Sequence, residues 1–227
     1  MEKILVVAAH PDDETLGAGA SIAKHVENGD LVSVVILGTG IASRKNDDED
    51  ISSELKKLRS DSKNALLKLG VTDLSFLDFP DNQFDSVPLL KIVKVLEGII
   101  ATKKPSIIYT HHWGDMNVDH QLTFKAVMTS SRPMESCSVK KILCFEVLSS
   151  TEWNIQNSQY AFMPNVYVDV SKQLSKKLKA LGEYKSEMKK YPHPRSIEGV
   201  EHLSRYRGLV ISTLAAEAFE LAREVQK

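Results

Sequence analysis

Short apolar runs alternate with longer amphipathic segments along most of this 227-residue chain. The runs are rich in β-branched residues, which is typical of buried strands, whereas the longer segments repeat their apolar residues at helical spacing. The pattern predicts strands at residues 4–8, 31–37, 74–77, 106–110, 141–148 and 166–170, and helices at residues 16–27, 51–69, 87–102, 121–130, 172–189 and 212–225. Because strands and helices alternate, we expect an α/β fold, a Rossmann-like three-layer sandwich in which helices cover both faces of a mostly parallel sheet.

Length and charge limit the organisation and the partners of the protein. A chain of 227 residues is long enough for one well-buried core and short for two domains of typical size, so we expect a single domain covering residues 1–227. Its 29 basic and 30 acidic side chains leave a net charge of −1, which provides no broad field to attract nucleic acid or an anionic membrane. We therefore expect no nucleic-acid partner.

Neither the apolar runs nor the cysteines indicate export or membrane insertion. No run approaches the ~18 apolar residues that a membrane-spanning helix needs, and the first residues form a strand rather than a signal peptide. Cys137 and Cys144 have neither a metal-ligand spacing nor the pattern of a disulfide framework. We expect a cytoplasmic protein without an integral membrane segment.

The polar residues directly after the first predicted strand carry the most distinctive chemistry. The sequence AHPDDE at residues 9–14 places His10, Asp12 and Asp13 at the carboxyl end of that strand, where α/β proteins build their sites. Imidazole nitrogen and carboxylate oxygen are both zinc ligands, and a catalytic zinc needs three protein ligands and a water. On these residues alone two interpretations stay open: a divalent metal site, or aspartates that cap the following helix.

A second cluster follows the strand predicted at residues 106–110. Residues 111–120 contain three of the seven histidines and two aspartates. His120, near the start of the next helix, is the candidate for a third metal ligand, because the carboxyl ends of parallel strands meet at one edge of a sheet. The alternative is a histidine on the solvated surface.

Together these clusters resemble the PIG-L/LmbE-like family of zinc-dependent de-N-acetylases. That family carries an AHPDDE-type motif near its start and an N-x-D-H or x-P-D-H motif about a hundred residues later, here the sequence NVDH at residues 117–120. The sequence LDFPD at residues 77–81 and the segments 207–208 and 216–219 match weaker family motifs in the same order. The resemblance implies an LmbE-like fold and a zinc ion, or another divalent metal, bound by His10, Asp13 and His120.

The resemblance also implies roles for residues around the metal. Asp12 becomes the general base, which accepts a proton from the metal-activated water, and Asp119 lies near the metal. Arg59 and Asp81 occupy positions that contact sugar hydroxyls in relatives. A surface ion pair is an equally good interpretation of Arg59, and a polar turn is an equally good interpretation of Asp81. At Asn117 this chain departs from the family, because many relatives have a catalytic histidine there.

Asn117 can donate a hydrogen bond, but it cannot supply a proton to the leaving amine. If a cationic imidazole is required, His111, His112 or His193 must provide it. We favour His193, which lies in the proline-flanked segment 191–196 and matches a stretch found in part of the family. The alternative is that this segment is a surface turn.

Two polar stretches leave further alternatives open. Residues 38–50 form either a mobile lid over the site or a surface loop. The basic residues at 185–190, together with Arg195, either contact a phosphorylated substrate or form a solvated surface.

The sequence therefore predicts a zinc-dependent amidohydrolase that removes acetyl from an N-acetylated amino sugar. The substrate is an N-acetylglucosamine-type glycoconjugate, a glycolipid precursor or a sugar nucleotide. Hydrolysis of another small amide, and a non-catalytic metal-binding or sugar-binding protein, are the alternatives. Retention of Asp12 argues against a pure binder, which has no need of a carboxylate that is not a ligand. The resemblance further implies a homo-oligomer, either a trimer or a hexamer.

Overall fold

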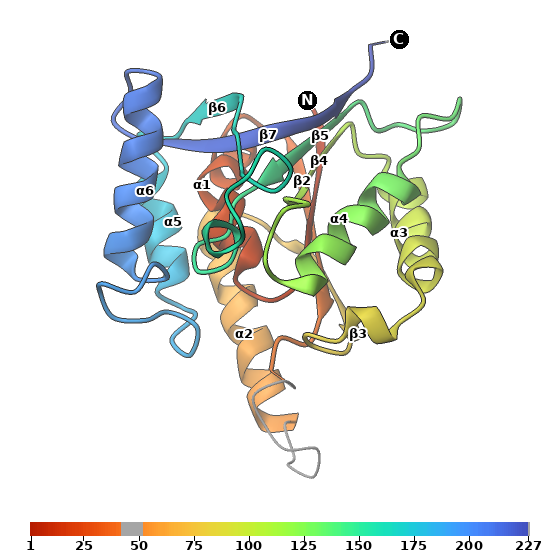
Figure 1. The fold of residues 1–227 in the computed structure, drawn as a ribbon, viewed down its shortest axis with the longest axis horizontal. Coiled ribbons are helices and arrows are strands. Elements are labelled where there is room, and N and C mark those ends of the chain that lie inside the picture. The colour runs from red at the N-terminus through yellow and green to blue at the C-terminus, as the bar shows by residue number, and fades with distance from the viewer. Residues whose placement is uncertain (42–51, 227) are drawn as a thin grey trace.

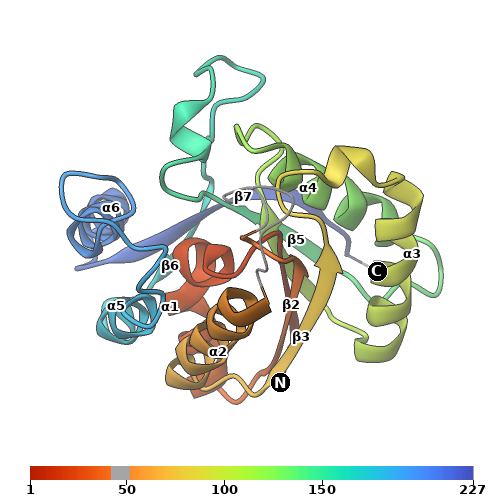
Figure 2. The ribbon, with the colours of Figure 1, turned by 90° about the horizontal axis from the view of Figure 1, so that it is seen from below.

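A seven-stranded sheet in the order β3-β2-β1-β4-β5-β7-β6 forms the centre of the molecule. The computed structural model describes residues 1–41 and 52–226, so most of the stretch expected to be a lid or a surface loop lies outside the described residues. One face of the sheet is covered by α1, α2, α5 and α6, and the other by α3 and α4 (Figure 2). The expected α/β sandwich is confirmed.

Parallel strands make up most of the sheet, since β1, β2, β3, β4 and β5 run in one direction, whereas β7 is antiparallel to both of its neighbours (Figure 1). The strands are β1 (Lys3–Ala8), β2 (Leu31–Gly38), β3 (Asp73–Phe79), β4 (Ile107–His111), β5 (Lys141–Phe145), β6 (Val166–Asp169) and β7 (Ala216–Glu224). The helices are α1 (Asp13–Glu27), α2 (Ser52–Leu69), α3 (Leu89–Lys103), α4 (Val118–Ser130), α5 (Leu174–Leu181) and α6 (Ile197–Val210), with short 3₁₀ turns η2 (Phe84–Ser86) and η3 (Thr151–Trp153).

Strand β1 is apolar throughout because both of its faces are buried. Ile4, Val6 and Ala8 pack toward the side of α1 and α2, whereas Leu5 and Val7 pack toward α3 and α4. A continuous apolar run is the pattern that a central parallel strand requires. Its burial fixes the point at which the chain leaves the sheet, and the polar residues of the AHPDDE segment begin there.

The helix predicted at residues 212–225 is wrong, because this segment forms strand β7. Its alanine, glutamate, leucine and arginine residues favour a helix by intrinsic propensity. In the structure, Phe219 is fully buried and lies opposite Phe145 in the pairing with β5, while the other edge of β7 pairs with β6. Burial and pairing on both edges outweigh the small differences in helix propensity.

The segment around residues 172–211 also differs from its prediction. The helix expected at 172–189 is limited to α5, which ends at Leu181, and α6 forms where no helix was predicted. Ser196 caps α6, since its hydroxyl accepts a hydrogen bond from the backbone N–H of Gly199 at 2.9 Å. The chain between α5 and α6 is left as an irregular connection. In the described part of the chain, no helix combines the length and the apolar character needed to cross a bilayer.

Close packing of α1 on the sheet depends on Gly17. A Cβ atom at this position would overlap the ring of Phe145, which is fully buried. We expect Gly17→Ala to lower the free energy of unfolding by about 1–3 kcal/mol, the usual cost of overpacking a filled core. Urea denaturation followed by circular dichroism measures this change.

Gly98→Ala is the matched control, because Gly98 is an exposed position in α3 where a Cβ would meet no atom within 4 Å. We expect this variant to gain roughly 0.5–1 kcal/mol from the better helix propensity of alanine. Equal responses of the two variants would contradict the close contact between α1 and Phe145.

Candidate metal and catalytic site

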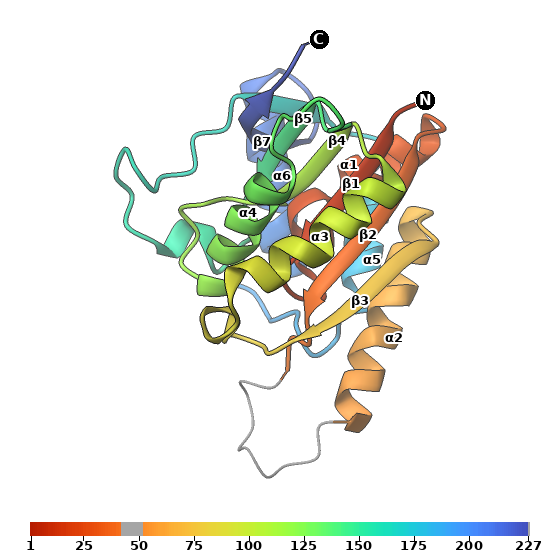
Figure 3. The ribbon, with the colours of Figure 1, turned by 90° about the vertical axis from the view of Figure 1, so that its right-hand side faces the viewer.

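The site forms where the order of the parallel strands reverses. Strand β1 lies between β2 and β4. The chain continues from β1 into α1 on one face of the sheet and from β4 into α4 on the other, which creates a crevice at the carboxyl ends of the two strands. His10 follows β1, and His120 lies in the first turn of α4, which follows β4. Two segments about a hundred residues apart in sequence therefore meet at one edge of the sheet (Figure 3).

The three predicted metal ligands lie together. Asp13 Oδ2 is 3.4 Å from His10 Nδ1 and 3.2 Å from His120 Nε2. One candidate ligand atom from each residue lies within 4.8 Å of the other two. Nitrogen and oxygen ligands at about 2.0–2.1 Å from a tetrahedral zinc would be roughly 3.3–3.4 Å apart. Both the donor atoms and their spacing fit a small divalent cation.

His120 is held by a buried carboxylate on the side facing away from Asp13. Its Nδ1 is 3.1 Å from Asp115 Oδ1. Asp115 in turn accepts hydrogen bonds from the hydroxyl groups of Ser150 and Thr151. Burial alone would raise the pKa of Asp115, but His120 and these hydroxyl groups hold it well below its usual range. A carboxylate behind a metal-binding histidine fixes the ring orientation and increases its basicity.

His10 has the same kind of support. Its Nε2 is 2.9 Å from Asp119 Oδ2 and 3.3 Å from Asp81 Oδ1. The carboxylate of Asp119 is itself fixed, because it accepts hydrogen bonds from the backbone N–H groups of Asn82 at 2.6 Å and Phe84 at 2.9 Å. The structure thus places the predicted residues Asp119 and Asp81 behind one ligand. Both of these carboxylates are buried.

The concentration of carboxylates makes the site favourable for positive charge. Burial by itself would lower the pKa of both candidate ligands, His10 and His120. Hydrogen bonds to Asp119 and Asp13 nevertheless raise the pKa of His10 to about 9, and Asp115 and Asp13 raise that of His120 to about 10. A bound divalent cation supplies positive charge at the same place without a proton on either ring. The charge balance therefore agrees with the donor geometry.

Asp12 does not act as a helix cap. It occupies the residue before α1, yet its side chain makes no capping hydrogen bond, and its backbone φ of 106° lies in the left-handed region that non-glycine residues rarely adopt. Its Oδ2 accepts a hydrogen bond from Arg195 Nη1 at 3.1 Å. Burial raises the pKa of Asp12 well above its usual range, and Arg195 opposes this effect. Strain of this kind is typical of functional positions.

The proline-flanked segment 191–196 contributes Arg195 to the cavity, not the predicted His193. Arg195 lines the cavity that contains Asp12 and the three ligands, whereas His193 does not. His193 Nδ1 instead accepts a hydrogen bond from the backbone N–H of Arg195 at 3.1 Å. Sequence reasoning grouped Arg195 with a basic patch, and no local signal pointed to its pairing with Asp12. A catalytic role for His193 stays a prediction.

Asn117 and the remaining histidines have defined structural positions. Asn117 lines the cavity, its Oδ1 caps α4, and its Nδ2 donates to Asn82 Oδ1 at 2.8 Å. His111 is fully buried, stacks on His120 and accepts a hydrogen bond from the backbone N–H of Ala9 at 2.9 Å. Burial lowers the pKa of His111 well below its usual value and that of His112 to about 4. Neither ring is suited to donate a proton near neutral pH.

Arg59, like His193, is a predicted site residue that does not line the cavity in the described part of the chain. It forms an ion pair with Asp78, and its guanidinium lies 5.2 Å from the centre of the Phe76 ring. The ion pair agrees with the alternative interpretation of Arg59, and its contact with substrate stays a prediction.

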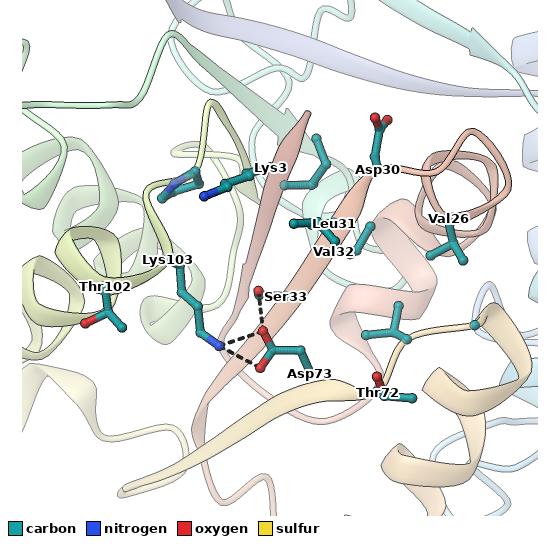
Figure 4. Close-up of a pocket in the computed structure, with 14 residues that line it drawn as sticks. Lys3, Val26, Asp30, Leu31, Val32, Ser33, Thr72, Asp73, Thr102 and Lys103 are labelled. Carbon is teal, nitrogen blue, oxygen red and sulfur yellow. Dashed lines mark hydrogen bonds and ion pairs between the residues drawn. The ribbon is translucent and has the colours of Figure 1, made fainter. Parts of the chain in front are cut away.

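The cavity at the ligands has a volume of about 120 Å³. A second cleft, of about 370 Å³, lies at the opposite edge of the sheet, where β1, β2 and β3 begin (Figure 4). There, Asp73 accepts hydrogen bonds from Lys103 and Ser33. This cleft contains none of the predicted site residues.

Comparison with known proteins identifies the family. The sequence model of PIG-L, described as GlcNAc-PI de-N-acetylase, matches residues 5–131. The uncharacterized deacetylase YaiS of Escherichia coli (strain K12) is 32% identical over 189 residues, which are 81% of this chain and 90% of the relative. This chain belongs to the PIG-L family. The diacetylchitobiose deacetylase of Thermococcus kodakarensis is 26% identical over 200 residues, covering 82% of this chain and 70% of the relative.

Solved structures share the fold at lower identity. The N,N'-diacetylchitobiose deacetylase from Pyrococcus horikoshii has a TM-score of 0.77 at 19% identity, covering 98% of this chain and 84% of that one. The 4-carboxy-2-hydroxymuconate hydratase GalB from Pseudomonas putida KT2440 has a TM-score of 0.78 at 18% identity, covering 100% and 98%. Since one of these proteins is a hydratase, the fold alone does not determine the reaction.

Asp115 belongs to the second sequence cluster, and its support of His120 becomes visible only in the structure. We expect Asp115→Asn to weaken zinc affinity by about 10–100-fold, because the ring of His120 would lose its charged partner. Competition with a chromophoric chelator measures this affinity.

Asp73→Asn is the matched control, since it removes a carboxylate at the opposite edge of the sheet. We expect its zinc affinity to equal that of the unmodified protein. Thermal melts of both variants separate loss of ligand support from loss of folding. An Asp115→Asn variant that binds zinc as tightly as the unmodified protein would show that Asp115 does not support His120.

Proposed function

We propose that this chain is a metal-dependent N-deacetylase that releases acetate from an N-acetylglucosamine-type amino sugar. The observation that carries this proposal is the set of half-buried His10 and buried Asp13 and His120, with Asp12 lining the same cavity. A binding protein needs the three ligands, whereas hydrolysis also needs a group that moves protons. Membership of the PIG-L family and the similarity to two deacetylases support the same reaction.

Zinc is the metal that we propose. Two imidazole nitrogens and one carboxylate oxygen form the ligand set of many catalytic zinc sites, which keep a further position open. When bound, the cation would polarise the acetamide carbonyl and make the attacking water more acidic. Another divalent metal is the alternative, and metal analysis of the purified protein distinguishes the two.

Asp12 is the group that we assign to proton transfer. Its carboxylate accepts the proton of the attacking water, and its raised pKa brings it closer to neutral pH, where general acid–base catalysis is efficient. Arg195 fixes the orientation of this carboxylate through the hydrogen bond at 3.1 Å. The adjacent residue Asp13 points to both ligand histidines, so the two neighbouring aspartates have separate tasks.

The leaving amine also requires a proton, and Asn117 cannot supply it. We propose that Asp12 returns the proton that it accepted, because it lines the cavity whereas His193 does not. Asn117 would then donate a hydrogen bond to the substrate or hold Asn82 in place. His193 is the alternative proton donor.

The substrate class follows from the relatives together with the polar cavity. The family description names a GlcNAc conjugate of phosphatidylinositol, and the relative from Thermococcus kodakarensis acts on diacetylchitobiose. Both contain an N-acetylglucosamine unit, so we propose this unit as the reacting part of the substrate. We propose that Asp81, which lines the cavity, contacts this unit.

We also propose that the protein works in a reducing, cytoplasmic compartment. Cys137 and Cys144 are both free thiols, and Cys144 is fully buried. Disulfide bonds are typical of exported proteins and rare in the cytosol. The single domain over residues 1–227 stays a prediction. The trimer or hexamer also stays a prediction, and size-exclusion chromatography with light scattering tests it.

Acetate release from free N-acetylglucosamine and its glycosides tests the function. We expect a zinc-loaded preparation to release acetate, a chelator to abolish the activity, and added zinc to restore it. Asp12→Asn should lower kcat by about 10²–10⁴-fold while zinc content stays constant, because the variant binds metal but cannot accept a proton.

Asp73→Asn again serves as the control and should retain the activity of the unmodified protein. Acetate release that survives Asp12→Asn unchanged would remove the proposed mechanism. A zinc-loaded protein that binds these sugars without releasing acetate would instead favour the non-catalytic alternative.

A further inference from the structure

The long connection between β5 and β6, residues 146–165, exposes apolar side chains beside the catalytic cavity. It extends away from the sheet as a loop (Figure 3). Ser149 and Ser150 near its beginning line the cavity. Trp153, three residues further on, ends the turn η3 and is 55% exposed. An indole with this exposure contributes little to the core, so another role must be considered.

Trp153 packs against the second segment that forms the cavity wall. Its ring lies 6.0 Å from the ring of His193, at an interplanar angle of 73°. His193 is two residues before Arg195, which lines the cavity. The two rings therefore connect the loop that supplies Ser150 with the loop that supplies Arg195, and each ring lies within three residues of a side chain that lines the cavity. This contact gives His193 a structural role, since it is not among the described residues that line the cavity.

As lined by the described residues, the cavity is too small to enclose a large substrate. Its volume of about 120 Å³ lies well below the ~300–1,000 Å³ of pockets that surround a drug-sized ligand. Charged and amide side chains, including Asp12, Asp81 and Arg195, form much of its wall. Such a cavity accommodates the acetamide group and the adjoining part of a sugar. Any group attached to that sugar has to lie on the rim.

We propose that Trp153, supported by His193, is a subsite for a second ring attached to the N-acetylated sugar; this inference rests on the proposed function. The exposed indole face provides a flat apolar surface on which the face of a sugar or cyclic polyol packs. Trp153 is thus a specificity-determining residue, which favours conjugates with a ring aglycone over the free monosaccharide.

The chemistry of the loop favours such a ring over an acyl chain. The exposed apolar residues Trp153 and Ile155 alternate with the polar residues Glu152, Asn154 and Gln156. An acyl chain requires a continuous apolar surface, which an alternating pattern interrupts. A cyclic polyol has one apolar face and polar edges, and it matches an exposed aromatic ring whose neighbours in the sequence, Glu152 and Asn154, are polar.

Steady-state acetate release tests the subsite with two substrates, free N-acetylglucosamine and N,N'-diacetylchitobiose. We expect Trp153→Ala to lower the ratio of kcat/KM for the disaccharide to that for the monosaccharide roughly tenfold, mainly through KM, which is the size expected for one lost ring contact. Trp153→Phe should restore most of the ratio. Tyr206→Ala is the matched control, because Tyr206 is an aromatic residue on α6 with a similar exposure of 59%.

Intrinsic fluorescence separates this inference from the proposed function. Adding the disaccharide should shift the emission of the unmodified protein, and Trp153→Phe should remove most of the shift. A shift without acetate release from either substrate would support the subsite and overturn the proposed function. Acetate release combined with an unchanged substrate ratio in Trp153→Ala would overturn the subsite. A variant that loses activity equally on both substrates would show a structural role for Trp153 and would also overturn it.

Discussion

The rest of the site depends on the contacts of the Asp13 carboxylate with His10 and His120, between which it lies. This carboxylate joins the segment after β1 to the segment after β4, and His10 and His120 are each supported on their other ring nitrogen by a further carboxylate. A buried group of negative charges of this kind is unfavourable unless positive charge compensates it. The carboxylates raise the pKa values of His10 and His120, so that protons on these rings compensate the negative charge. A divalent cation would supply the same compensation.

The division of labour between Asp12 and Asp13 depends on the backbone. Asp12 has a positive φ, and its side chain bonds to Arg195 instead of capping α1. Asp13 is the first residue of the helix, and its carboxylate contacts the histidines. Two adjacent carboxylates thereby have different partners, an arginine for one and imidazoles for the other. Burial raises the pKa of Asp12, and neighbouring acids add to this effect against the opposing charge of Arg195. Burial would also raise the pKa of Asp13, but the surrounding histidines hold it well below its usual range.

The sheet provides a scaffold, and the irregular connections decide the chemistry. Similar sheets support a deacetylase and a hydratase, so the reaction must depend on residues outside the strands. Here the connection between β5 and β6 supplies Ser150, and the connection between α5 and α6 supplies Arg195. Loops held by a rigid scaffold commonly carry function, because they tolerate changes that the core does not.

The sequence by itself determined the central strand and the α/β class, and it singled out His10, Asp13 and His120, which the fold brings together as a group that could hold a metal. These features depend on local information: an apolar run that must be buried, and clusters of histidine and aspartate directly after strands. Residues that act through distant partners required the tertiary structure. Arg195 pairs with a carboxylate 183 positions away, and Asp115 is one of several acids whose distinct role appears only beside His120.

Strand β7 illustrates the same limit for the fold. Its sequence favours a helix locally, but pairing with β5 and β6 and the burial of Phe219 make it a strand. Propensity differences amount to only about 0.7 kcal/mol per residue among ordinary residues, and burial of one aromatic side chain is worth more. Where local preference and long-range contacts disagree, the contacts determine the structure because they contribute the larger free energy. The sequence did not predict β7 because these contacts leave no local pattern.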